Sequence, residues 1–279
     1  MIKLDGVSFR YEGGQKFALS DINLSIGRGE FVGVIGSAGA GKTTLTRVLS
    51  GVVPHVRRGD FYGSAMIDGR DTVQTAPAEL AATIGCVFQD IESQFVTTMV
   101  EDEVLYALEN FDIPRDEIKG RVDQVLRDMG VTELRDRPLA SLSGGQKQKV
   151  ILATIFALAP DVIVLDEPTG ELDPQSSAQV FDLLSDMRAK RGTTIVIVEQ
   201  KIMMLCQHAD RLIVMDQGSV VLDGPVRSLL ERPDRLYELG VNCPRATTLA
   251  ADMRKRGFTI AAVPVTVSEA EAMVREAIS

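Results

Sequence analysis

Apolar residues follow two different periods along the first and middle parts of the 279-residue chain. Over 2–9 and 18–26 they alternate with polar residues, which predicts short, mostly antiparallel strands with one buried face. Later runs are apolar without interruption, as is typical of strands buried on both faces of a parallel sheet. These runs cover residues 31–35, 84–88, 162–165 and 194–198.

Between about 100 and 139 the apolar residues recur with a helical period, interrupted at Pro114 and Gly130. This change of period predicts a small helical subdomain inserted into an α/β core. Strand character over 61–71 and a late hairpin around Asp216-Gln217-Gly218, joining strands 212–215 and 220–222, complete the predicted sheets. Further helices are predicted near 42–49, 176–190, 247–256 and 268–278.

Composition excludes several classes of protein. Three widely separated cysteines (Cys86, Cys206 and Cys243) argue against a disulfide framework and favour a reducing compartment. Two histidines, His55 and His208, leave little for a zinc site. A net charge of −9 weakens the case for nucleic-acid binding by phosphate neutralisation alone.

The sequence shows no secretory signal and no membrane-spanning segment. Its longest apolar stretch, 150–165, is interrupted by Pro160 and Asp161 and is too short to cross a bilayer. We therefore expect a soluble, cytosolic chain that does not cross a membrane by itself.

A glycine-rich segment directly follows the first buried strand and opens a helix. It reads Gly36-Ser37-Ala38-Gly39-Ala40-Gly41-Lys42-Thr43, followed by Thr44, and it matches the P-loop pattern G-x-x-x-x-G-K-[ST]. Its backbone N–H groups and the helix N-terminus are suited to phosphates. Lys42 would reach the β- and γ-phosphates, and Thr43 would hold Mg²⁺. The alternative is an ordinary glycine-rich turn between a strand and a helix.

A second candidate segment ends the apolar run 162–165 with two carboxylates. Asp166, at the tip of a buried strand, could hold the Mg²⁺ shell, and Glu167 could act as the general base on an attacking water. A strand that ends in Asp-Glu is by itself usually the start of a solvated loop. The P-loop upstream favours the catalytic interpretation.

Leu142-Ser143-Gly144-Gly145-Gln146-Lys147-Gln148 resembles the signature of the ABC-type ATPases. In physical terms, Ser143 caps a helix, and the two glycines that follow it leave the first N–H groups of that helix accessible. This makes a second anion site in a chain that already has a P-loop. The resemblance covers about 1–224 and implies a head-to-tail dimer. The signature residues Ser143, Gly144, Gly145 and Gln146 would then act on the γ-phosphate in the other subunit.

Three further residues match positions of that family. Tyr11 matches the aromatic residue that stacks on adenine, with an exposed strand tyrosine as the alternative. Gln89 matches the glutamine loop that senses Mg²⁺ and the attacking water. Asp173 matches the loop that crosses the dimer interface.

Two positions depart from the family pattern. Ala38 stands where the family usually has Asn, a mild change because the backbone does most of the binding there. Gln200 stands where the family has a catalytic histidine. A Gln amide can donate a hydrogen bond to a γ-phosphate but cannot become a cation, so we expect slower hydrolysis or a stronger site in a second, different ATPase subunit.

The segments 89–94, 98–104 and 107–110 are similar to those of the ATPases of energy-coupling factor (ECF) importers of vitamins and metals. This resemblance implies an ATP- and Mg²⁺-dependent subunit on the cytoplasmic face of the membrane. Its partners would be a second ABC ATPase, an integral membrane coupling subunit and a substrate-binding membrane subunit, with no nucleic acid. Alternatively, the acidic run 101–103 merely favours a helix N-terminus.

The predicted fold is α/β, a RecA-like P-loop NTPase core with an antiparallel β subdomain. It comprises an ATPase domain over 1–224, with its helical signature subdomain at about 90–145, and a C-terminal extension over 225–279 that could mediate dimerisation. Three other functions stay open at this point: the ATPase of a classical ABC importer, a soluble ABC ATPase, and a partner that binds nucleotide without hydrolysing it. One ATPase unit, no heptad run and no cysteine cluster disfavour the soluble DNA-repair and translation classes.

Overall fold

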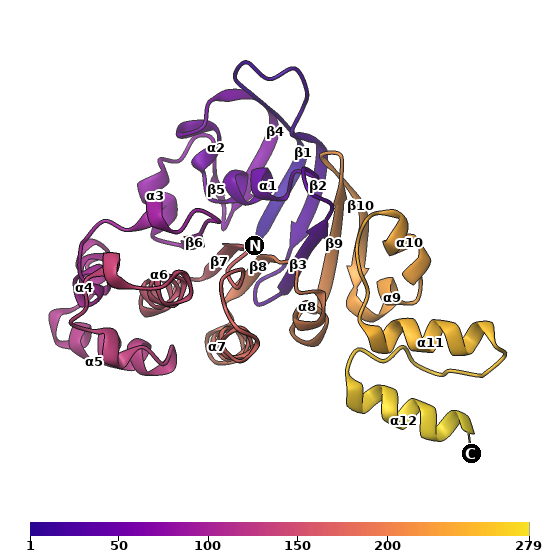
Figure 1. Ribbon diagram of the computed structural model, residues 1–279. Coiled ribbons are helices and arrows are strands. Elements are labelled where there is room, and N and C mark those ends of the chain that lie inside the picture. Colours follow the sequence, from indigo (N-terminus) through magenta and orange to yellow (C-terminus); the bar gives the residue numbers. More distant parts are fainter. Residues whose placement is uncertain (279) are drawn as a thin grey trace.

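Two β-sheets organise the structure, a computed structural model that describes residues 1–278 (Figure 1). The smaller sheet has the order β2-β1-β4-β5 and all its neighbours are antiparallel. Ile2, Leu4, Val7 and Phe9 alternate with more exposed residues on its central strand, as the sequence predicts. The strands of this sheet are β1 (Ile2–Tyr11), β2 (Leu19–Ile26), β4 (Gly59–Ile67) and β5 (Arg70–Asp71).

The larger sheet has the order β10-β9-β3-β8-β7-β6. Its strands from β9 to β6 are parallel, and only the edge strand β10 runs antiparallel to its neighbour. The predicted β9–β10 hairpin is present and turns at Gln217-Gly218, both of which have positive φ. The strands are β3 (Phe31–Gly36), β6 (Ile84–Val87), β7 (Val162–Asp166), β8 (Thr194–Val198), β9 (Arg211–Asp216) and β10 (Ser219–Pro225).

Helices cover both faces of the larger sheet (Figure 1). Alternate residues of β3 and β8 point to opposite faces, so Val32 and Val196 join the core shared with helix α1 and the smaller sheet, whereas Phe31 and Ile195 join the core under α6, α7 and α8. Burial on both faces explains the continuous apolar runs. The main helices are α1 (Lys42–Leu49), α4 (Val100–Asn110), α5 (Arg115–Asp128), α6 (Gly144–Leu158), α7 (Pro174–Arg191) and α8 (Ile202–His208).

The C-terminal extension divides into two parts by its packing. Val226, Leu230, Leu236 and Val241 are buried in the same core as α6, α7 and α8, and this core also includes Val263 and Val265 from the segment between α11 and α12. The last two helices form a separate small core of their own, made by Ala250, Met253, Ile260 and Met273. The helices of the extension are α9 (Val226–Leu230), α10 (Pro233–Glu238), α11 (Arg245–Lys255) and α12 (Val267–Ile278).

The fold class is as predicted, and the differences are local. The predicted strand 61–71 is two strands, because Asp68 and Gly69 adopt positive φ and turn the chain between β4 and β5. Short helices escaped prediction because one or two turns carry too little periodicity. These are α8, α9 and α10, together with α2 (Val52–His55) and α3 (Pro77–Ala81).

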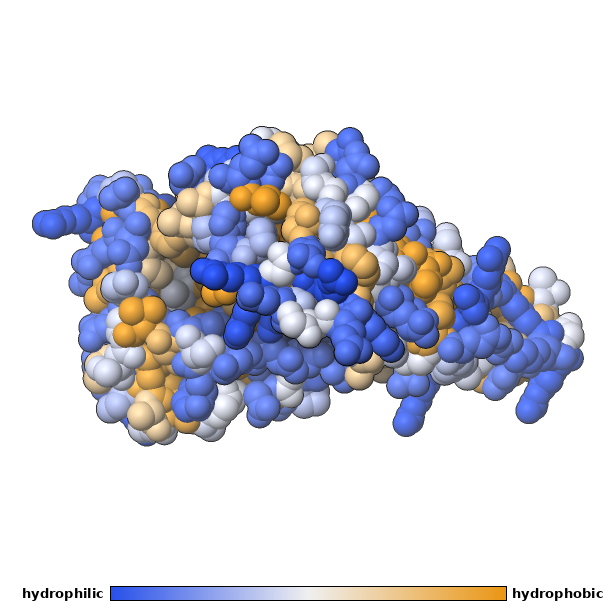
Figure 2. All heavy atoms as spheres, turned by 90° about the horizontal axis from the view of Figure 1, so that it is seen from above, coloured by the Kyte–Doolittle hydropathy of each residue, from blue (hydrophilic) through white to orange (hydrophobic). Residues whose placement is uncertain are grey.

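Within residues 1–278, no helix combines the length and the apolarity that a bilayer crossing requires. Seen from above, the surface is largely hydrophilic and its apolar side chains gather in separate patches (Figure 2).

Candidate functional site

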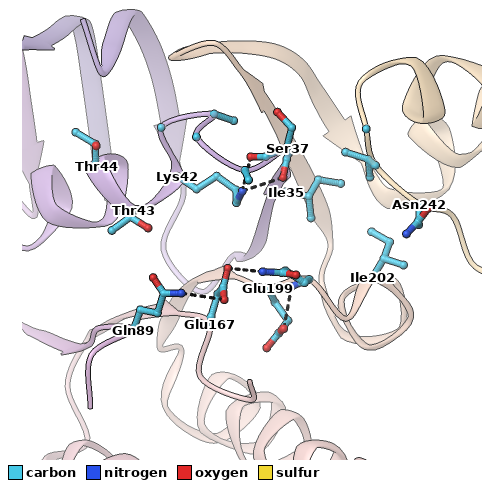
Figure 3. A pocket seen from close by; sticks show the side chains of 18 of the residues that line it. Ile35, Ser37, Lys42, Thr43, Thr44, Gln89, Glu167, Glu199, Ile202 and Asn242 are labelled. Carbon is cyan, nitrogen blue, oxygen red and sulfur yellow. Dashed lines mark hydrogen bonds between the residues drawn. The ribbon is translucent and has the colours of Figure 1, made fainter. Parts of the chain in front are cut away.

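The P-loop lines a cleft of about 540 Å³ at the carboxyl end of the parallel strands. It connects β3 to α1, and its glycines permit this path: Gly36, Gly39 and Gly41 all have positive φ, and a Cβ on Gly36 would lie 2.1 Å from the Met215 carbonyl oxygen. The structure brings together the predicted residues Gly36 to Thr44, Gln89, Glu167 and Gln200 around this cleft (Figure 3).

Lys42 is the one lysine among the residues that line the cleft. Its Nζ donates hydrogen bonds of 2.8 Å to the carbonyl oxygens of Gly36 and Ser37, which holds the ammonium over the loop. Burial lowers the pKa of Lys42, while the nearby carboxylates of Glu167 and Asp166 oppose that shift. The cleft thus presents a partly desolvated cation among backbone N–H groups, which suits a phosphate.

Asp166 lies at the end of β7, behind the residues that line the cleft, and is only 1% exposed. Burial raises its pKa, and hydrogen bonds from Thr43 and Thr46 oppose the shift. None of the ion pairs within residues 1–278 involves this carboxylate. A buried carboxylate beside a threonine hydroxyl is a fitting oxygen donor set for Mg²⁺.

No group of three or more His, Cys, Asp or Glu side chains in the described part of the chain is arranged to hold a metal ion. A Mg²⁺ ion at this site would therefore depend on nucleotide phosphates for much of its coordination, as is usual for this cation. Thr43 and Asp166 are the protein groups that fit it, and Gln89, which is also predicted to contact the metal, lines the same cleft.

Glu167 projects into the cleft and accepts hydrogen bonds from two amides (Figure 3). Gln200 Nε2 donates to Glu167 Oε1 at 2.7 Å, and Gln89 Nε2 donates to Glu167 Oε2 at 3.4 Å. Glu167 also has a positive φ of 54°, uncommon for a residue other than glycine, and its amide N–H donates to the Val198 carbonyl oxygen at 2.9 Å. Two side chains predicted to be catalytic thus orient the carboxylate of a third.

The residues on either side of Gln200 hold the loop that follows Glu167. The buried Glu199 carboxylate accepts a hydrogen bond of 2.5 Å from the Thr169 hydroxyl. Lys201 Nζ donates to the carbonyl oxygens of Thr169 (2.8 Å) and Leu172 (3.0 Å) and to Ser177 Oγ (2.8 Å). The segment 199–201 therefore contacts both the candidate base and the loop over 169–173.

The signature residues do not lie at the P-loop cleft of their own chain. Ser143, Gly144, Gly145 and Gln146 line a separate depression of about 470 Å³, together with Asp173. Ser143 is the N-cap of α6, and Gln146 completes a capping box with hydrogen bonds of 3.3 and 3.0 Å. One chain therefore carries the P-loop cleft and the signature depression as two separate surfaces.

Asp173 has a local structural role that the sequence reasoning missed. It is the N-cap of α7, where its carboxylate accepts hydrogen bonds from Ser176 N at 2.9 Å and Ser176 Oγ at 2.6 Å. These hydrogen bonds lower the pKa of Asp173. The motif Asp-Pro-x-Ser before a helix was a signal that could have revealed the cap.

Tyr11 lies beside the cleft rather than among its lining residues. Its hydroxyl lies 3.1 Å from Thr44 Oγ1 and accepts a hydrogen bond of 2.9 Å from Arg47, and its ring packs edge-on against Phe9. The ring also borders a shallow pocket over 10–14 and 58–60. Through Thr44 it is one contact away from the P-loop.

The structure adds residues to the site that the motifs did not reveal. Gln148, which is 2% exposed, joins the signature helix to the candidate base: it donates to the Glu167 carbonyl oxygen at 3.2 Å and accepts from Glu171 N at 3.0 Å. Other additions line the cleft from distant parts of the chain, and no local pattern marks them. They are Ala18, Ile35, Glu199, Ile202, Gly240, Val241 and Asn242.

The sequence pattern of the ABC transporter family matches residues 19–170, and the chain belongs to this family. It is 37% identical to a protein of Pyrococcus horikoshii named an ABC transporter ATP-binding protein, over 94% of this chain and 93% of that one. This protein is therefore an ATP-binding subunit of the ABC transporter family.

Two solved structures are similar to it over most of their length. CbiO1 of Clostridium perfringens, part of the ABC transporter complex CbiONQ, has a TM-score of 0.72 at 31% identity, with 90% of this chain and 98% of that one covered. The ATP-binding cassette MJ0796, a dimer bound to ADP and Pi, has a TM-score of 0.72 at 27% identity, with 81% and 99% covered.

Proposed function

We propose that this chain hydrolyses ATP and powers an importer of the energy-coupling factor type, as a peripheral subunit on the cytoplasmic face of the membrane. The observation that carries the proposal is the cleft, where a P-loop lysine faces a carboxylate held by two amides. The similarity to CbiO1, a part of a transporter complex, extends over 90% of the chain and supports this class of transporter.

In this proposal Glu167 accepts a proton from a water molecule while the oxygen of that water attacks the γ-phosphorus. The bond between that phosphorus and the bridging oxygen breaks, which releases ADP and inorganic phosphate. Lys42 and the P-loop N–H groups stabilise the phosphate charge, and Gln89 and Gln200 orient the carboxylate. Bound Mg²⁺, held by Thr43 and Asp166, supplies charge neutralisation at the phosphates. Tyr11 is the proposed stacking partner of the adenine.

The separation of the P-loop cleft from the signature depression supports a head-to-tail dimer. In such a dimer, the signature residues 143–146 of one subunit would complete the P-loop site of the other, and Asp173 would lie near the contact between subunits. The partner is a second copy or a related ABC ATPase. We also propose that the extension over 225–279 contributes to contacts between the subunits.

Two exposed apolar side chains in the segment that follows the glutamine loop support docking of a membrane subunit. Val96 is 63% exposed and Tyr106 is 46% exposed. The buried Glu103 carboxylate accepts hydrogen bonds from the N–H groups of Val96 and Thr97, which fixes this loop against α4. A rigid loop that starts at Gln89 can pass movement of the cleft to a docked helix.

The chemistry is tested by measuring ATP binding and steady-state hydrolysis of Glu167→Gln. We expect kcat to fall about 10²- to 10⁴-fold while ATP binding persists, because the variant keeps the shape of the side chain but cannot accept the proton. Glu79→Gln on the exposed face of α3 is the matched control. Hydrolysis by Glu167→Gln equal to that of the parent would contradict the assigned base.

The transporter class is tested by purifying the tagged chain from membranes and identifying the proteins that accompany it. We expect two integral membrane proteins, one for coupling and one for substrate binding, and an ABC ATPase partner. Recovery of only soluble partners would overturn the importer assignment without affecting the assignment of the base.

A further inference from the structure

The C-terminal extension reaches the nucleotide cleft. The loop between α10 and α11 contributes Gly240, Val241 and Asn242 to the lining, about 200 residues after the P-loop in sequence. A Cβ built on Gly240 would lie 3.5 Å from Ser37 Cβ, so this loop lies directly beside the P-loop, with space for little more than a methyl group between them.

The loop holds a defined position at this contact. Gly240 has a φ of +71°, and its N–H donates to the Tyr237 carbonyl oxygen at 2.9 Å, which ends α10. The next amide, Val241 N, donates to the Leu236 carbonyl oxygen at 2.9 Å. Leu236 is 0% and Val241 is 6% exposed, both within the main core. The backbone that leads into Asn242 is therefore held in place.

Asn242 differs from its neighbours because its side chain is exposed, whereas Val241 and Cys243 are buried. Figure 3 shows it across the cleft from Gln89, with Ile202 beside it. Ile202 follows Gln200 by two residues, and Gln200 contacts the candidate base. Asn242 therefore lines the cleft on the side of the segment that carries Gln200 and Ile202.

We propose that Asn242 is a nucleotide-binding residue supplied by the C-terminal extension, with its carboxamide donating to phosphate oxygens at the γ-phosphate end. This inference rests on the proposed ATP-binding role of the cleft. A neutral amide donor complements Lys42, because it adds a hydrogen bond without adding a second buried charge. The ligand class is a nucleoside triphosphate, and a diphosphate lacks the group that Asn242 contacts.

The contact links the nucleotide to the last two helices. From Asn242 the chain passes through Cys243 to Pro244, the N-cap of α11. Helix α11 is joined to the segment before α12 by a hydrogen bond of 2.8 Å from Thr247 Oγ1 to the Pro264 carbonyl oxygen. A triphosphate bound to Asn242 therefore restrains the start of the α11–α12 unit, so that the extension distinguishes ATP from ADP.

The test measures the affinities of ATP and ADP, without Mg²⁺ to prevent turnover, for the full chain and four variants. Asn242→Ala is expected to weaken ATP binding about 5- to 10-fold and ADP binding less than about 2-fold. Asn242→Asp places a negative charge at the same position and is expected to weaken ATP binding more than Asn242→Ala does, with the difference shrinking at high salt. Asn110→Ala, at the exposed end of α4, is the matched control.

Lys42→Ala distinguishes a failure of the proposed ATP site from a failure of the proposed role of Asn242. If Lys42→Ala leaves ATP affinity unchanged, the proposed ATP site is wrong. If Lys42→Ala abolishes binding but Asn242→Ala and Asn242→Asp bind ATP as the parent does, only the role of Asn242 is overturned. An equal loss for ATP and ADP in Asn242→Ala would also overturn it, because that result indicates a general effect on the loop.

Hydrogen exchange supplies a second readout. A non-hydrolysable ATP analogue is expected to slow exchange of the amides of 240–243 in the parent chain, and to a smaller extent in Asn242→Ala. Unchanged exchange over these residues at a saturating concentration of the analogue would contradict the link between nucleotide and extension.

Discussion

Replacement of Lys201 by methionine tests how firmly the loop over 169–173 is held. The substitution keeps most of the aliphatic stem and removes an ammonium that donates hydrogen bonds of 2.8, 3.0 and 2.8 Å to Thr169 O, Leu172 O and Ser177 Oγ. Thr169 is 0% exposed and Ser177 is 1% exposed, so water cannot readily replace the Lys201 ammonium as the hydrogen-bond donor to these residues.

The expected loss of stability follows from these contacts. A hydrogen bond to a charged group contributes about 1.5–3 kcal/mol, but the three share one half-buried ammonium whose ordering and desolvation offset part of the gain. We expect the free energy of unfolding of Lys201→Met to fall by about 2–4 kcal/mol. For a chain of this size that corresponds to a Tm lower by about 5–10 °C.

The assay compares thermal unfolding of Lys201→Met with that of Lys190→Met. Lys190 is 71% exposed and pairs with Asp186 four residues earlier on the same helix, so its loss is expected to cost less than about 0.5 kcal/mol. We also expect ATP hydrolysis by Lys201→Met to fall more than ATP binding, because the loop continues directly from Glu167. Equal Tm values for the two variants would refute the claim that Lys201 anchors the loop.

Three further predictions test separate parts of the structure. Gln200→His is expected to hydrolyse ATP at least as fast as the parent, and a marked loss of rate would show that residue 200 is not at the switch position. Burial lowers the pKa of His208 below 6.5. The contribution of His208 to the free energy of unfolding is therefore fully present above pH 6.5 and decreases as the pH falls, by at most about 1.4 kcal/mol per pH unit. His208→Gln should remove this pH-dependent contribution, as measured by urea unfolding at pH 7 and pH 5. Gly145→Ala places a Cβ 2.9 Å from the Glu171 carbonyl oxygen and should lower Tm and hydrolysis more than Gly144→Ala, whose Cβ meets only the movable Glu171 side chain at 3.3 Å; similar effects of the two would contradict the steric argument.

Much of the fold could be predicted because local patterns of apolar, polar and glycine residues determine it. Strands β3, β7 and β8 are continuous apolar runs, since both faces of the sheet are covered, and the β9–β10 turn contains Gly218, which readily adopts positive φ. The P-loop likewise brings its residues together within nine consecutive positions. Local sequence is sufficient wherever the chemistry and the geometry both come from neighbouring residues.

The remainder of the site depends on contacts between distant segments. The three residues that accept hydrogen bonds from Lys201 precede it by 24 to 32 positions, and no sequence period or motif spacing predicts these contacts. Gly240 and Asn242 are similar cases, because their place at the P-loop results from the packing of α9 and α10 on the core. Such positions become visible only when the path of the chain between the segments is known.

The division of the extension by its packing also sets the natural unit for exchange between related proteins. A junction at residue 225 would separate Val226, Leu230 and Leu236 from the apolar surface that they complete and would take the Gly240 loop away from the P-loop. A junction near Pro244 leaves both intact and transfers α11 and α12 with their own small core, together with Val263 and Val265, which lie between these helices and pack in the main core. Chimaeras joined near Pro244 therefore fold well only when the new segment between the terminal helices fills the places of Val263 and Val265.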